Sequence, residues 1–155
     1  MTATIDQELY RTAVQTFEDL AFLLPIPDEG PAPACPLTWV SVTFRGPFSG
    51  RILVGCSEGV LQALAANMLG DSDAPSPTQQ LDALREIANV LCGNLLPKIA
   101  GTQAIFRMEA PALCEEPPTC TEAQPAACAR VCLMEGCAQV SLFLDAPLAE
   151  LVNRP

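Results

Sequence analysis

The chain has 155 residues, half of them hydrophobic and only 17% charged, a composition that excludes disorder along its whole length. Its 8 basic and 18 acidic residues give a formal net charge of −10, and no stretch of the sequence clusters the basic ones, so we expect no nucleic-acid partner. The length suits one hydrophobic core, and we therefore expect a single domain over residues 1–155.

Targeting signals and several catalytic motifs are absent from the sequence. The amino-terminal residues lack the basic start and apolar run of a secretory signal peptide, and no apolar stretch has the length of a membrane span. We therefore expect a cytoplasmic protein. Because the chain has no histidine, a Ser-His-Asp triad and a histidine phosphocarrier are both excluded. No glycine-rich nucleotide loop occurs either.

The sequence contains eight cysteines, at positions 35, 56, 92, 114, 120, 128, 132 and 137. No pair has Cys-x-x-Cys spacing, and the absence of histidine removes the usual partner of cysteine at zinc sites. A reducing compartment argues against disulfides, so most of these residues are interpreted as small buried hydrophobes, and no metal site is predicted. The segment from 114 to 137 is the one place where a metal or redox sensor remains an alternative.

In chain order, the first predicted elements are a helix and a hairpin. Residues 5–24 carry apolar side chains at helical spacing up to Leu24, and the proline-rich stretch 25–36 ends this helix as a loop. Residues 38–45 alternate and are rich in β-formers, and residues 51–56 follow after a glycine turn. This pattern predicts two paired strands.

Two helices follow the hairpin. Ser57 is the predicted N-cap of a helix that runs to Leu69 and stops at Gly70. A second, longer helix is predicted from Ser76 to about residue 100, with a capping box formed by Ser76 and Gln79.

The remaining pattern predicts strands. Residues 102–109 indicate one strand and residues 110–127, rich in Pro, Glu and Cys, indicate a loop. Residues 128–134 and 138–144 predict a second hairpin, and the last residues give at most one helical turn. We expect an α/β (α+β) sandwich, a mostly antiparallel sheet with two long helices packed on one face.

Polar residues on the long helix form a narrow ridge. With Asp82 placed at zero and about 100° per residue, Glu86 falls near 40°, Asn89 near −20° and Gly93 near 20°. The apolar residues gather on the opposite side of the helix: Leu84, Ile87, Ala88, Leu91 and Leu95.

A solvent-exposed polar face on an amphipathic helix explains most such ridges. Two features go beyond that explanation, because the ridge is nearly free of long basic side chains and Gly93 makes part of it low. Glycine inside a helix costs about 1 kcal/mol relative to alanine, and close approach of another surface would explain why it is tolerated.

The motif Asp82-x-x-x-Glu86-x-x-Asn89 resembles the Asp/Ser-x-x-x-Glu-x-x-Asn signature of the CheC/CheX/FliY family of chemotaxis phosphatases, which is related to FliM. The hairpin VTFRGPFSGRILV, the helix LQALAANMLG and the continuation from Asn89 to Gly93-Asn94 are also similar to CheX-like domains. The likeness runs from about residue 10 to residue 145. The full motif occurs once, as in CheX, whereas CheC typically carries two.

This resemblance implies a substrate and a role for each ridge residue. The substrate would be a phosphorylated CheY-like receiver, which supplies Mg²⁺, so this chain needs no bound cofactor. Asn89 would orient the attacking water beside the aspartyl phosphate, and Glu86 would pair with the active-site lysine of the receiver. Asp82 and Gly93 would support docking. The resemblance also implies a homodimer, and the edge near 110–135 is where we expect a second copy to pair.

Three functional hypotheses follow from the sequence. The first is a phosphatase acting on a response regulator in chemotaxis or two-component signalling. The second is a non-catalytic module of the same fold that binds a receiver or a component of the flagellar switch. The third is the cysteine-based metal or redox sensor.

Overall fold

The computed structural model describes residues 4–27, 36–69, 74–114 and 125–145. Its elements in chain order are α1 (Ile5–Ala21), β1 (Thr38–Arg45), β2 (Gly50–Cys56), α2 (Glu58–Leu69), α3 (Pro77–Ala100), β3 (Arg107–Met108), β4 (Ala112–Cys114), β5 (Ala127–Leu133) and β6 (Gly136–Leu144). The predicted stop at Gly70 and the predicted carboxy-terminal turn lie outside the described residues.

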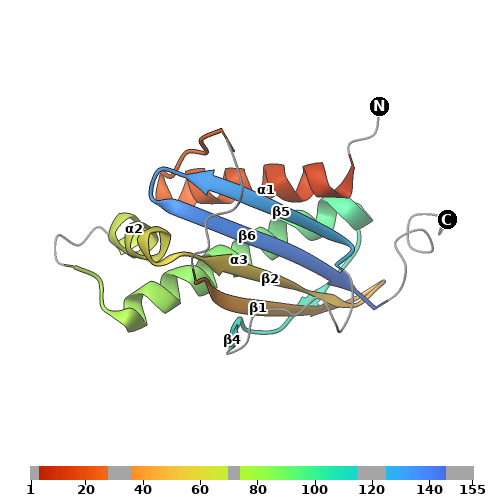
Figure 1. The fold of residues 1–155 in the computed structure, drawn as a ribbon. Helices are drawn as coiled ribbons and strands as arrows, with labels where there is room; N and C mark the ends of the chain where they lie inside the picture. Colours follow the sequence, from red (N-terminus) through yellow and green to blue (C-terminus); the bar gives the residue numbers. More distant parts are fainter. Residues whose placement is uncertain (1–3, 28–35, 70–73, 115–124, 146–155) are drawn as a thin grey trace.

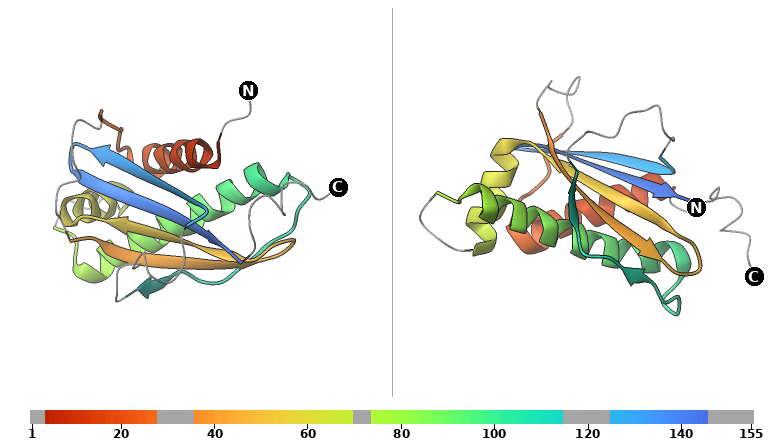
Figure 2. Two further views of the ribbon diagram at one scale, coloured as in Figure 1. Left: turned by 45° about the vertical axis from the view of Figure 1, so that its right-hand side comes forward. Right: turned by 90° about the horizontal axis from the view of Figure 1, so that it is seen from below.

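The strands form one sheet in the order β3-β1-β2-β6-β5, with β4 also paired to β1, and every pairing is antiparallel. Helices α1 and α3 lie along one face of this sheet, and α2 lies at one end (Figure 1 and Figure 2). Helix α1 packs under β5, α3 packs under β1 and β2, and α2 packs against α3 and β6. The predicted antiparallel sheet with two long helices on one face is confirmed.

The first hairpin shows how strand alternation builds the core. Val40, Val42 and Phe44 of β1 are fully buried in the cluster beneath the sheet. The residues between them point to the face on which no described helix lies, because successive side chains of a strand alternate. Ile52 and Val54 continue the same buried rows on β2, so the predicted strands and their shared apolar face are both present.

Helix α1 ends earlier than predicted. Phe22 adopts a left-handed conformation with φ 57°, a common way for a helix to end, and the amide of Leu23 donates to the carbonyl of Phe17 at 3.2 Å. The side-chain amide of Asn67 donates to the carbonyl of Ala21 at 2.7 Å. Leu24 is therefore outside the helix and 61% exposed, and the predicted end of the helix at residue 24 is wrong. The capping contact comes from α2, which local periodicity does not reveal.

The predicted strand over residues 102–109 is wrong, since only Arg107–Met108 pair with β1. The predicted loop over 110–127 also needs correction, because Ala112–Cys114 form β4 on the same edge of β1. Pro111 lies between the two short strands. Proline has no amide hydrogen to donate to a sheet, so one edge strand is divided into two pieces.

The second hairpin and the two helix starts agree with the sequence in outline. Strands β5 and β6 are displaced by only one or two residues from the predicted 128–134 and 138–144. Ser57 precedes α2 as predicted, but its hydroxyl accepts the amide of Cys137 at 3.2 Å and so joins the helix to β6.

Helix α3 begins with the predicted capping box. The Ser76 hydroxyl accepts the amide of Gln79 at 3.2 Å, and the Gln79 side chain accepts the amide of Ser76 at 2.9 Å. Pro97 lies inside the helix, which continues to Ala100 as predicted.

Candidate functional site

Helix α3 separates an apolar side from a polar one, as the sequence predicts. Its apolar residues Leu84, Ile87, Ala88, Leu91 and Leu95 are fully buried. They pack toward β1, β2 and the two other helices. Because a helix turns by about 100° per residue, the residues on the opposite side face outward.

The ridge is formed by Asp82, Glu86, Asn89 and Gly93 of α3. Asp82, Glu86 and Gly93 are exposed, whereas Asn89 is half-buried. From Asp82 to Gly93 the ridge extends about 16 Å along the helix axis, at about 1.5 Å per residue. The structure thus places the four predicted residues on one outward-facing strip of the helix, with Asn89 the least exposed of them.

One end of the ridge carries an ion pair. The guanidinium of Arg85 lies 3.4 Å from the carboxylate of Asp82, and the two side chains are 40% and 65% exposed. One basic side chain, that of Arg85, therefore lies beside the amino-terminal end of the ridge. An exposed i, i+3 pair of this kind contributes only a few tenths of a kcal/mol, so a partner can displace it.

Glu86 and Asn89 lie on adjacent turns of α3. Within the described part of the chain, neither side chain forms a hydrogen bond or an ion pair with another side chain. A carboxylate accepts hydrogen bonds and attracts cations, while an amide both donates and accepts. Side by side, the two groups are able to bind a cationic side chain and to orient a water molecule.

Gly93 is the low point of the ridge. A Cβ built at this position meets no atom within 4 Å, so the packing of this chain does not require glycine there. Its carbonyl is the i−4 group that Pro97, lacking an amide hydrogen, leaves without the usual helical bond. The missing bond concerns the backbone of Gly93 and does not call for a small side chain, so within the described residues nothing requires glycine at this position.

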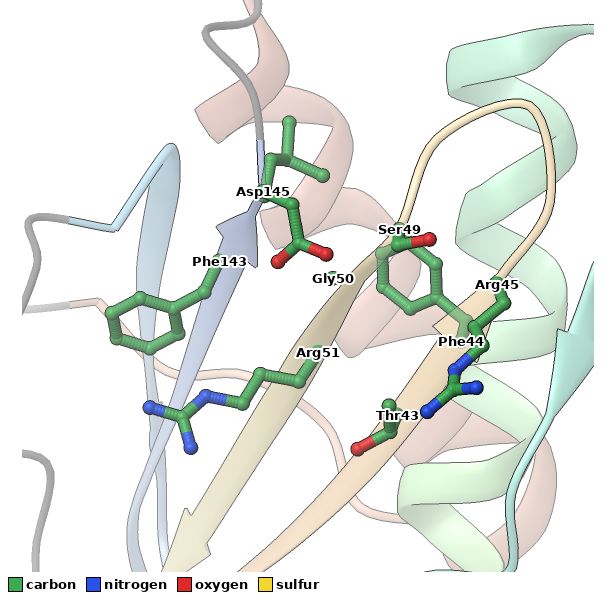
Figure 3. A pocket seen from close by; sticks show the side chains of 9 residues that line it. Thr43, Phe44, Arg45, Ser49, Gly50, Arg51, Phe143 and Asp145 are labelled. Carbon is green, nitrogen blue, oxygen red and sulfur yellow. The ribbon is translucent and has the colours of Figure 1, made fainter.

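A hollow of about 380 Å³ lies on the other face of the sheet and is lined by residues of β1, β2 and β6 and of the turns beside them (Figure 3). Arg45 and Arg51 project from its neighbouring strands, and the Arg51 guanidinium lies 5.1 Å from the centre of the Phe143 ring. Arg107 is the register partner of Arg45 and so points to the same face. Sequence reasoning missed this group because strand pairing brings together arginines that are far apart in the chain.

The described residues include no group of three or more cysteine, aspartate, glutamate or histidine side chains arranged to hold a metal ion. The hypothesis of a cysteine-based metal sensor thus finds no set of metal ligands within the ranges 4–27, 36–69, 74–114 and 125–145. None of the described helices is long and apolar enough to cross a membrane.

Comparison with known proteins places the fold and the ridge in context. The sequence model of the family described as "Chemotaxis phosphatase CheX" matches residues 39–135, which include the entire ridge. No curated protein matches the sequence.

The solved structures that resemble most of the chain include three CheX proteins. A CheX chemotaxis protein from Vibrio vulnificus is 17% identical, with a TM-score of 0.74 and coverage of 92% of this chain and 97% of the other. A chemotaxis protein CheX from Desulfovibrio desulfuricans is 18% identical, with a TM-score of 0.69 and coverage of 91% and 99%. A CheX from Borrelia burgdorferi, solved in a complex described as CheX-CheY-BeF3-Mg, is 14% identical, with a TM-score of 0.63 and coverage of 90% and 97%.

Proposed function

Because this chain belongs to the family of the chemotaxis phosphatase CheX, we propose that it hydrolyses the aspartyl phosphate of a CheY-like receiver and that the ridge on α3 is its docking and catalytic surface. One observation carries the proposal. Glu86 and Asn89 lie side by side on an outward-facing helix, without side-chain partners in the described part of the chain. The complex of the Borrelia CheX with CheY supports a receiver as the partner.

The reaction demands little of this chain beyond positioning. A water oxygen attacks phosphorus, the bond between phosphorus and the aspartyl oxygen breaks, and the carboxylate leaves with its electron pair. An acyl phosphate already has a good leaving group, and Mg²⁺ expected in the partner receiver neutralises phosphate charge. No nucleophile, histidine or bound cofactor is needed on this chain.

Asn89 is the residue we assign to water positioning. Its amide accepts a hydrogen bond from water through the oxygen and donates to a phosphate oxygen through the nitrogen. When the water is held in line with the bond that breaks, the entropy cost of bringing it to the phosphorus has already been met on binding, and this lowers the barrier. Half-burial of Asn89 restricts its side chain and lowers the entropy lost on docking.

Glu86 is assigned to recognition of the receiver. Its exposed carboxylate would pair with the active-site lysine of the receiver and so fix the docking register. A charged contact of this kind governs specificity and encounter rate more than affinity. Asp82, one turn earlier, would support the same contact after exchanging its pairing with Arg85. Gly93 would allow close approach at the other end of the ridge.

The decay of a phosphorylated CheY-type receiver from the same cell tests this proposal. We expect the wild type to accelerate decay and Asn89→Ala to lower kcat/KM by about 100-fold, since the water is no longer oriented. A matched control is Gln15→Ala, which removes an exposed amide from α1 and should leave the rate unchanged. The variant Glu86→Gln should weaken receiver binding while Asn89→Ala largely preserves it.

The same assay separates the phosphatase from the interaction module. Receiver binding without acceleration by the wild type would reject the enzyme and favour the module. An Asn89→Ala variant that is as active as the wild type would place catalysis elsewhere. The proposal also requires the cytoplasmic location predicted from the sequence, where receivers are found.

A further inference from the structure

The β5–β6 hairpin places two cysteines directly opposite each other. Cys132 of β5 and Cys137 of β6 are register partners, and Leu133 and Gly136 are the next pair toward the turn. Register partners of an antiparallel pair project to the same face of the sheet. The two thiols therefore lie next to each other, although their sequence spacing resembles no common motif.

Backbone hydrogen bonds show which type of pair this is. The amide and carbonyl of Cys137 both bond to Ser57, at 3.2 and 3.0 Å, and therefore point away from β5. The carbonyl of Cys132 accepts the amide of Ile26 at 2.8 Å and points away from β6. The two residues thus form a non-hydrogen-bonded pair, the type in which the Cα atoms lie about 4.5 Å apart. A disulfide requires about 4.4–6.8 Å.

The hairpin that holds the pair is tightly fixed beside α2 (Figure 1). Gly136 has φ 151°, and a Cβ at this position would collide with the hydroxyl of Ser57. A Cβ at Gly59 would likewise collide with the carbonyl oxygen of Glu135. These close contacts, with the two hydrogen bonds of Ser57, fix the register and so the relative position of Cys132 and Cys137.

The other described cysteines lack this arrangement. Cys128 is exposed on β5, but its register partner is Ser141. Cys56 has Thr38 and Ala138 as its register partners and Cys92 lies on α3, so neither faces a second cysteine across a strand pair, and burial raises the pKa of both thiols. A thiol must ionise to attack a disulfide. Cys132 is half-buried and is therefore the more accessible of the two thiols, whereas Cys137 beside it is buried.

We propose that Cys132 and Cys137 form a dithiol site that a low-molecular-weight disulfide, of the glutathione disulfide type, converts to a cross-strand disulfide. The thiolate of Cys132 attacks one sulfur of the small disulfide, a mixed disulfide forms, and one small thiolate leaves and takes up a proton. The thiolate of Cys137 then attacks the Cys132 sulfur and releases the second small thiol. The protein dithiol is oxidised, and one small disulfide is reduced to two thiols.

Peptide mapping tests this site directly. The full chain is equilibrated with glutathione disulfide, its remaining thiols are alkylated, and trypsin is added. Cleavage after Arg130 releases a peptide whose only cysteines are Cys132 and Cys137. We expect this peptide to lose both alkylation sites and to weigh less than its reduced, unalkylated form by two hydrogen atoms. Cys56 and Cys92 should remain reduced and become alkylated only after unfolding.

Single variants identify the two sulfurs. Cys132→Ser and Cys137→Ser should each abolish the bridge, whereas the matched control Cys128→Ser should keep it. A peptide that is still alkylated at both cysteines after equilibration would overturn the proposal. So would a stable glutathione adduct on Cys132 of the wild type without bridging, or a bridge from either residue to Cys128. Because the readout is chemical, its result is independent of any phosphatase activity.

Discussion

Two glycines at α3 show how the same residue type serves different purposes. Gly93 lies inside the helix and Gly101 ends it, and a Cβ at either position meets no atom within 4 Å. They differ in backbone conformation. Gly101 has φ 94° and ψ 157°, a region that is essentially restricted to glycine. Gly93 has no such restriction, so glycine lowers the stability of the helix at this position without any steric need for it.

Gly93→Ala should stabilise the free protein. We expect the free energy of unfolding to rise by about 1 kcal/mol, because alanine favours the helix and the added methyl meets open space. Urea unfolding measures this change. If the ridge docks a receiver at close range, the same variant should weaken receiver binding. Greater stability with unchanged binding would remove Gly93 from the docking surface.

The control for this substitution is Gly101→Ala. Here we expect a loss of about 1–3 kcal/mol, because alanine is strained in the backbone conformation of Gly101. The opposite signs of the two effects would confirm that conformation, rather than packing space, decides the outcome at these positions.

At the scale of the element, α3 is a helix whose limits the sequence predicts well. Its signals are local: the capping box at Ser76, proline at the first helical position, and an apolar stripe that recurs every three to four residues. Helix α1 shows the reverse case, since its end depends on Asn67 of another helix. The prediction for the edge strand is wrong for a similar reason, because Pro111 and the neighbouring β1 decide where pairing occurs.

Ser76→Ala should destabilise the start of α3. Loss of the hydroxyl leaves the amide of Gln79 without its capping bond, and we expect the free energy of unfolding to fall by about 1 kcal/mol. Urea unfolding provides the measurement. Thr78→Ala, at an exposed position in the same turn, should change stability by much less. Equal losses for the two variants would refute the role assigned to the cap.

At the scale of the whole molecule, the two edges of the sheet differ. On β5, the amide of Cys128 donates to the carboxylate of Asp6 at 3.0 Å, and the carbonyl of Cys132 is bonded to Ile26. These contacts hinder the addition of another strand. On the opposite edge, β4 presents the half-exposed side chain of Leu113. Of the predicted stretch 110–135, the β4 end is therefore the better place for a second copy to pair.

We expect light scattering after size-exclusion chromatography to give twice the mass of one chain. Leu113→Lys should shift this value to a monomer, because a charge on an edge strand opposes strand pairing. The matched charge change on the other edge, Cys128→Lys, should leave the dimer intact. A monomeric wild type would contradict the predicted homodimer, and dissociation by Cys128→Lys alone would move the interface to β5.

The sequence by itself determined the helices, the two hairpins and the side of α3 on which Glu86 and Asn89 lie, because helical and strand periodicity and capping act over a few residues. Only the tertiary structure decided where α1 ends, how the edge strand divides, and which cysteines and arginines become neighbours. Those outcomes depend on strand register, as for Cys132 with Cys137, and on contacts between distant segments, as for Arg45 with Arg107. The pattern within one strand shows which side chains share a face, but not which residue of a distant strand lies opposite each of them.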